Sequence, residues 1–133
     1  MQRMQGRRQD GFTLVELITV MAIISILVAI ALPSYRYAVL HAREAVLKED
    51  LFNFRRAIDQ YKMDKGHYPE SLQTLVEEGY LRRLEPDPIT QAMDWQEIDA
   101  DSDPSNPDEP PGIYDIKSNS ERVSLSGEPY SEW

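Results

Sequence analysis

The sequence predicts an α+β fold in which one long N-terminal helix packs on a small antiparallel sheet from the C-terminal part of the chain. Three observations predict it. An apolar run with one charge covers residues 12–32, and an apolar stripe at helical spacing then continues to Tyr61. Two short segments of alternating polarity follow residue 111. The 133 residues leave room for one modest domain beyond the apolar run.

Composition and charge exclude several classes of protein. The chain has 14 Lys and Arg against 23 Asp and Glu, for a formal net charge of −9, which argues against a nucleic-acid partner. The first ten residues are the exception, with Arg3, Arg7 and Arg8 against Asp10. The absence of cysteine excludes disulfides, thiol chemistry and zinc sites built on cysteine.

The apolar run reads as a membrane-spanning helix. Residues 12–32 would form a helix of about 31 Å, which matches the hydrocarbon core of a bilayer. A cleaved secretory signal is the alternative, but the run is too long for one and is followed by Pro33-Ser34-Tyr35-Arg36, with no small-x-small cleavage site. The basic residues before it predict a cytoplasmic N-terminus and a C-terminal part on the opposite side of the membrane.

Glu16 is the one charged residue in this run. An ionisable side chain inside a spanning segment is costly and indicates a function with a partner. One interpretation is that Glu16 lies close enough to the interface to reach water. The favoured interpretation is that it pairs with a cation of a neighbouring subunit.

The segment Gly11-Phe12-Thr13-Leu14-Val15-Glu16, after its basic leader, resembles the processing signal of type IV pilins and type II secretion pseudopilins. The resemblance implies that a prepilin peptidase cuts between Gly11 and Phe12 and that Phe12 is then N-methylated. It implies that residues 1–11 are a cleaved cytoplasmic leader and residues 12–33 the transmembrane half of the stem helix. It further implies that Glu16 pairs with the α-amino group of Phe12 during filament assembly.

The helix is expected to continue past Pro33 with a kink, because helical pattern resumes from Ser34 to about Asp64. The stripe in this half consists of Leu40, Leu47, Leu51, Phe54, Ile58 and Tyr61, with Glu44 at the one polar position and Ala38, Ala42, Ala45, Val46 and Ala57 widening it. The stripe requires a cover, for which the chain's own C-terminal part is favoured and a coiled-coil partner is the alternative. Gly66 is expected to cap the helix. The resemblance implies that Pro33 leaves a loosened segment in assembled filaments.

The rest of the chain is expected to form the head. Residues 70–78 predict a short helix, and residues 92–98, 112–117 and 121–126 predict strands. In residues 112–117, Ile113 and Asp115 should share one face, and Tyr114 and Ile116 the other. Residues 99–111 predict a loop, because Asp, Ser, Asn and Pro interrupt any strand. Tyr130 and Trp133 are expected to dock on the sheet or the helix.

The resemblance extends into the head. The segment from Tyr61 to Pro69, then Leu72 and Leu75, and then Asp87-Pro88 and Asp94-Trp95 resemble the major pseudopilins of type II secretion systems, also called G pseudopilins. This resemblance favours a pseudopilin over a generic pilin. It implies that residues 34–133 form a periplasmic head that includes the amphipathic half of the stem.

A metal site is the open question of the head. Residues 85–109 carry many carboxylates and no Lys or Arg, and Asp99, Asp101 and Asp103 repeat at the first spacings of an EF-hand loop, but Pro104 and Pro110 break that pattern. The resemblance implies a calcium ion near the C-terminus, yet residues 117–121 depart from the family's segment there, so no ligands transfer. The interpretations are a solvated acidic loop or a calcium site of unknown ligands.

The sequence does not predict an enzyme. His41 and His67 belong to no paired motif, and no catalytic triad or phosphate-binding loop is present. The expected function is that of a structural subunit of a type II secretion pseudopilus, which polymerises through its N-terminal helix and drives export of folded proteins across the outer membrane. The alternatives are a type IV pilin or minor pilin for adhesion, motility or DNA uptake, and a monomeric membrane-tethered binding module.

The implied partners are further copies of this chain, the prepilin peptidase and methyltransferase, other pseudopilins, inner-membrane secretion components and the membrane itself. The implied location is the cell inner membrane, which the chain crosses once with its head in the periplasm. Sequence alone does not indicate which proteins are exported or the symmetry of the filament.

Overall fold

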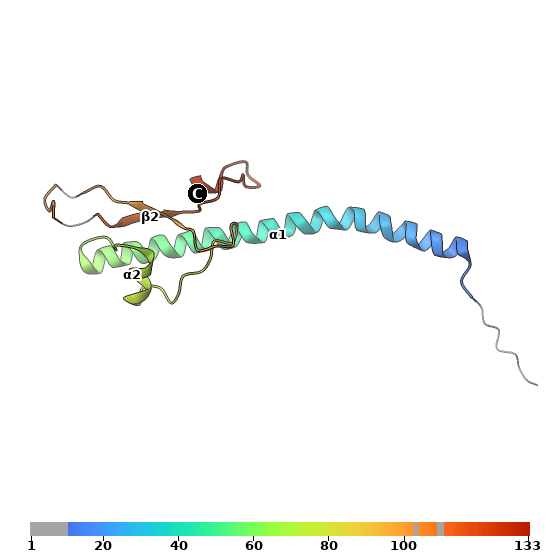
Figure 1. Cartoon of the computed structure of the whole chain (residues 1–133), viewed down its shortest axis with the longest axis horizontal. Coiled ribbons are helices and arrows are strands. Elements are labelled where there is room, and N and C mark those ends of the chain that lie inside the picture. The colour runs from blue at the N-terminus through green and yellow to red at the C-terminus, as the bar shows by residue number, and fades with distance from the viewer. Residues whose placement is uncertain (1–10, 103, 109–110) are drawn as a thin grey trace, which may run out of the picture. The chain divides into compact units, whose positions relative to one another are not determined.

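The computed structural model describes residues 11–102, 104–108 and 111–133. The basic leader residues, Asp103 and Pro110 of the sequence predictions lie outside these residues. The chain divides into two compact units, one of residues up to Ala38 and one of Val39–Trp133. Helix α1 (Leu14–Lys65) begins in the first unit and ends in the second (Figure 1).

Within the first unit, the described residues are the non-helical Gly11, Phe12 and Thr13 and the first part of α1, and all of them are exposed. The helix continues through Pro33, as the sequence predicts. Proline has no N–H to donate to the carbonyl of Ala29, so one hydrogen bond of the helix is missing at this point. The Ser34 hydroxyl donates to the carbonyl of Ile30 one turn back, at 3.3 Å.

Within the second unit, α1 buries one stripe and leaves the other faces exposed. The buried residues are Glu44, Leu47, Leu51, Phe54, Ala57, Ile58 and Tyr61. Of the residues expected to widen the stripe, Ala57 is buried, whereas Ala38, Ala42, Ala45 and Val46 are exposed, so the stripe is narrower than the sequence predicts. Gly66 ends the helix in the left-handed region at φ 82°, and its N–H donates to the carbonyl of Lys62 at 2.9 Å. The predicted glycine cap is therefore confirmed.

A short helix, α2 (Leu72–Glu77), follows the turn after α1 and is narrower than the expected range of 70–78. Pro69 precedes it and Ser71 caps it, since the Ser71 hydroxyl accepts the N–H of Thr74 at 3.3 Å. Gly79 closes it at φ 83°. Leu72 and Leu75 are its buried residues, as the sequence predicts.

The sheet has two antiparallel strands, β1 (Gln96–Asp99) and β2 (Ile113–Lys117), which run beside the second half of α1 (Figure 1). The pairing shifts between Ile98 and Asp99, which face Asp115 and Ile113 respectively, so Tyr114 is the extra residue of a bulge. A bulge reverses the alternation of side chains beyond it. Ile113 and Ile116 are therefore both buried, and the predicted pairing of Ile113 with Asp115 on one face is wrong.

The third predicted strand is not formed. Residues 121–126 contribute only one isolated bridge, between Val123 and Pro129. The segment turns back on itself at Gly127, where φ is 92°, and the N–H of Ser124 donates to the carbonyl of Glu128 at 2.8 Å. These local bonds use backbone groups that a longer ladder would require. A 3-10 turn, η1 (Tyr130–Glu132), follows.

The core lies between the stripe of α1 and the elements that cover it. Its members outside α1 are Leu72, Leu75, Ile89, Ile113, Ile116 and Tyr130. Tyr130 is 1% exposed, and Trp133 packs against the cluster, so the predicted docking of these two aromatics is confirmed. The chain's own C-terminal part therefore covers the stripe over this core, which was the favoured alternative to a coiled coil.

Candidate functional site

The predicted cut site lies just outside the first turn of α1. Gly11, Phe12 and Thr13 are non-helical and exposed. The Thr13 hydroxyl accepts the N–H of Glu16 at 3.1 Å, and the Thr13 carbonyl accepts the N–H of Leu17 at 3.1 Å, so Thr13 caps the helix. The bond between Gly11 and Phe12 therefore lies in an exposed, non-helical segment just before the helix.

Glu16 lies in the first turn of α1, where the positive end of the helix dipole favours a negative charge. Its carboxylate forms no ion pair with any residue that the structure describes. Phe12 precedes it by four residues, outside the helix. Gly11, Phe12 and Glu16 therefore all lie at the start of α1, whereas Pro33 lies about 26 Å beyond Glu16 along the same helix.

Beyond Glu16 the helix presents an apolar surface on all sides. Among the described residues, α1 is the one helix long and apolar enough to cross a membrane, with a mean hydropathy of 2.7 over its best window and none of that window buried. Thr19 and Ser25 donate their hydroxyls to the carbonyls one turn back, both at 2.8 Å. A helix that is apolar all round requires lipid or other helices around it.

The head contains a buried carboxylate that the sequence did not mark as functional. Glu44 is 7% exposed, and one of its oxygens accepts two bonds, from the N–H of Leu125 at 2.8 Å and from the hydroxyl of Tyr130 at 2.7 Å. Burial and the adjacent Glu44 carboxylate raise the pKa of Tyr130 to about 12, so its hydroxyl remains a donor at neutral pH.

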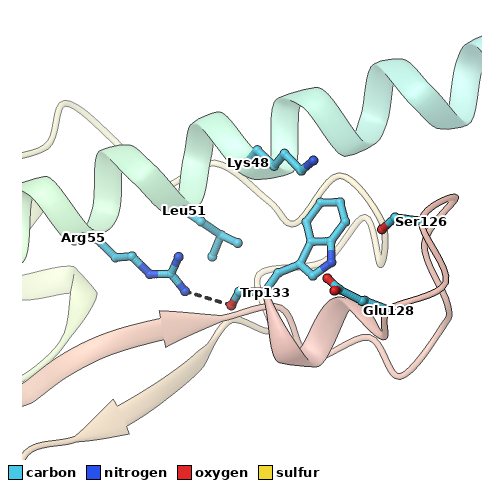
Figure 2. A pocket seen from close by; sticks show the side chains of 6 residues that line it. All are labelled: Lys48, Leu51, Arg55, Ser126, Glu128 and Trp133. Carbon is cyan, nitrogen blue, oxygen red and sulfur yellow. Dashed lines mark hydrogen bonds between the residues drawn. The ribbon is translucent and has the colours of Figure 1, made fainter.

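Arg55, about three helical turns after Glu44 on α1, also binds the C-terminal part of the chain. Its Nε donates to the carboxylate of Asp115 at 2.7 Å, and its Nη2 donates to the main-chain oxygens of Ile116 at 3.0 Å and Trp133 at 2.8 Å. Figure 2 shows Arg55 and Lys48 on α1 beside Trp133. The Lys48 ammonium lies 4.6 Å from the centre of a Trp133 ring. These side chains line a cavity of about 290 Å³.

Sequence reasoning missed both Glu44 and Arg55 as anchors of the C-terminal segment. The sequence could have indicated the role of Glu44, because this residue occupies the one polar position of an otherwise apolar stripe. A carboxylate buried there requires hydrogen-bond donors. For Arg55 the sequence carried no signal, since its three acceptors come from residues 60 or more positions away.

The acidic residues proposed for calcium do not gather in the described part of the chain. Asp99 and Asp101 are exposed, and Asp103 lies outside it. Asp87 is buried, but its oxygens accept bonds from the N–H of Ile89 and from the hydroxyl of Ser118. No three His, Asp or Glu side chains among the described residues come close enough to hold a metal ion. The described carboxylates therefore form no group of three that could hold calcium.

Three comparisons relate this chain to known proteins. Residues 6–32 match the family described as the prokaryotic N-terminal methylation motif. The chain is 35% identical over 101 residues to type II secretion system core protein G of Pseudomonas aeruginosa, covering 64% of this chain and 71% of that protein. It is 33% identical to the protein of the same name from Escherichia coli K12, covering 61% and 67%. No solved structure shows a significant match.

The fold and the junction together define the class. The chain has a long helix whose first half is apolar and exposed, a methylation motif at the start of that helix, and a small α+β head. This is the architecture of a pilin-like, membrane-anchored protein. Within that class, the chain belongs to the family of type II secretion system core protein G, the major pseudopilins. This is a structural, non-enzymatic family, and the type IV pilin alternative is not favoured.

Proposed function

We propose that this chain is a structural subunit of a type II secretion pseudopilus and polymerises through the apolar half of α1. The observation that carries the proposal is the first turn of that helix. There a single carboxylate, Glu16, begins an exposed apolar surface and finds no cation among the described residues. A helix that only anchored the head would gain nothing from a charge at this position.

Processing prepares this helix for assembly. A prepilin peptidase cuts between Gly11 and Phe12, and a methyltransferase then methylates the new amino group. A Cβ at Gly11 would meet no atom of the chain within 4 Å, so the local fold does not itself require glycine there. The requirement for glycine belongs to the peptidase, which must bind the backbone closely at the bond that it cuts.

The cut creates the cation that Glu16 lacks. The new α-amino group of Phe12 is positively charged, and it lies at the end of a helix buried among copies of itself in a filament. Pairing of this amino group with Glu16 of a neighbouring copy would neutralise both charges in a medium of low dielectric constant. Because each helix carries both groups at fixed positions, the pair would set the axial register between neighbours. Pro33 would leave the loosened segment of the helix in the assembled filament.

The wider setting follows from the family. The chain crosses the inner membrane once, with the leader in the cytoplasm and the head in the periplasm, as the basic leader predicts. Its partners are further copies of itself, other pseudopilins and the inner-membrane components of the secretion system. Growth of the pseudopilus in the periplasm drives folded proteins out through the outer membrane.

Deletion and complementation in the host test this function together with its processing. The wild-type chain should restore secretion, and mass spectrometry should find a mature chain that begins at N-methylated Phe12. The Gly11→Val variant should keep its leader and leave secretion at the level of the deletion strain. Thr13→Ser is the matched control, since it keeps the capping hydroxyl and should be cut and secrete normally. Normal secretion by an uncut Gly11→Val chain would contradict the proposal.

A further inference from the structure

The resemblance implies a calcium ion near the C-terminus of the head, where residues 117–121 stand in place of the family's segment. The segment of residues 118–133 forms this end of the head, and its first serine hydroxyls are used for internal bonds. The buried Ser118 hydroxyl donates to Asp87 and accepts the N–H of Ser120 at 3.2 Å. The Ser120 hydroxyl accepts the N–H of Arg122 at 3.3 Å. The first turn of the segment is thus closed by serine hydroxyls and one buried carboxylate.

The contact between this segment and Glu44 is opposite to what a cation site requires, because the segment provides hydrogen-bond donors there. At Glu44 the segment presents donors, the N–H of Leu125 and the hydroxyl of Tyr130, to a buried anion on α1. A loop that binds calcium turns oxygen atoms toward the ion. A hydrogen bond from a neutral donor to a carboxylate is stronger than one between neutral groups, so this buried oxygen holds the segment at two points.

Oxygen atoms near both ends of the segment, which could otherwise bind a metal ion, already accept bonds from Arg55. The guanidinium of Arg55 binds the main-chain oxygens of Ile116 and Trp133 and the carboxylate of Asp115. Figure 2 shows its bond to Trp133. The carboxylates that remain in the segment are exposed: Glu121, Glu128 and Glu132. Glu44 and Arg55 lie on the same face of α1, about three turns apart.

We infer that Glu44 and Arg55 form a two-point latch that holds residues 118–133 on α1 without a bound calcium ion. Glu44 accepts bonds from two donors of the segment. Arg55 donates to the main-chain oxygen of its last residue, Trp133, and to Asp115 and Ile116 just before the segment. The latch lies in the head, and the inference does not depend on filament assembly.

The test uses the full chain in detergent, with trypsin cleavage after Arg122 as the readout of segment release. The main chain of Arg122 accepts the N–H of Tyr130 at 3.0 Å, so cleavage there requires local opening of the segment. In the wild-type chain, EDTA and 1 mM CaCl2 should give the same cleavage rate and the same Tm. Glu44→Leu and Arg55→Met should each accelerate cleavage about tenfold or more, because each leaves buried groups unpaired.

Milder variants keep the test decisive if these two fail to fold. Tyr130→Phe keeps the ring that packs on Trp133 but removes one donor to Glu44, and should accelerate cleavage several-fold. Tyr114→Phe and Glu49→Leu, both at exposed positions, are the matched controls and should leave the rate unchanged. Faster cleavage in EDTA that calcium reverses would overturn the inference. So would latch variants that cleave at the rate of the controls.

Discussion

At the scale of single residues, Glu44 and Asp50 show how differently one helix can accommodate two carboxylates. Glu44 is buried and has two donors. Asp50 has one oxygen that is fully buried with no hydrogen-bond partner among the residues that the structure describes. Burial, and then the nearby carboxylates Glu85, Glu49 and Asp87, raise the pKa of Asp50 above its ordinary value of 3.8. The charge of Asp50 therefore destabilises the folded head.

The pH dependence of stability should reveal this charge. Because the folded-state pKa of Asp50 is raised, the folded head binds this proton more tightly than the unfolded chain does. The resulting stabilisation is complete below the unfolded pKa and is lost as pH rises through the folded value. At pH 7.5, Asp50→Asn should therefore raise Tm relative to the wild-type chain. The gap should close as pH falls to 4.

Thermal melts of the full chain in detergent across this pH range measure the gap. Asp59→Asn, an exposed change on the same helix, is the control and should shift Tm little at any pH. A gap between Asp50→Asn and the wild-type chain that stays constant from pH 7.5 to 4 would mean that the charge of Asp50 is not the cause.

At the scale of elements, the stripe of α1 carries the stability of the head. Ile58 is 0% exposed, whereas Phe52 on the same helix is 63% exposed. Ile58→Ala should lower the free energy of unfolding by about 2–5 kcal/mol, because it removes buried surface and leaves a cavity. Phe52→Ala should change it by about 0.5 kcal/mol or less.

Urea unfolding of the full chain in detergent, followed by tryptophan fluorescence, compares these two variants. Trp95 packs edge-on against Phe54 in the core, with ring centres 5.0 Å apart, so its emission reports on the covered stripe. Equal losses from the two variants would show that α1 is covered on a different face from the one described.

The elements differ in how far the sequence predicts them, and the reason is the range of the interactions that form them. The cap at Gly66 and the buried positions of α1 from Leu47 to Tyr61 depend on neighbours within a few turns, and they are predicted correctly. The bulge at Tyr114 and the loss of the strand over 121–126 depend on pairing and turns that periodicity does not encode. The residues of the alternating segment 121–126 instead form local hydrogen bonds, several of them with serine hydroxyls.

At the scale of the whole molecule, the sequence predicts the membrane anchor, the cleavage site between Gly11 and Phe12, and the family. The motifs that indicate them consist of residues that are neighbours in the sequence. Leader composition, the Gly11-Phe12 pair and the apolar run require no tertiary contact to be recognised. The anchors of the C-terminal segment are different. Glu44 meets Leu125 and Tyr130 across more than 80 positions, so only the folded chain shows what this carboxylate holds.

The central claim is that Glu16 directs polymerisation by pairing with the processed N-terminus of a neighbouring copy. Removing one partner of a buried ion pair costs about 3–5 kcal/mol, which corresponds to a loss of about two orders of magnitude or more in association. Glu16→Gln keeps the size of the side chain and removes the charge. Glu16→Asp keeps the charge at a shorter reach and should retain part of the function.

The most direct measurement is chemical cross-linking of the mature chain in host membranes, with cleavage after Gly11 confirmed by mass spectrometry. The account predicts that wild type gives a ladder of multimers and that Glu16→Gln, although cut and inserted in the membrane, gives none. Glu16→Asp should give a weakened ladder. A full ladder and normal secretion from the Glu16→Gln chain would contradict the account.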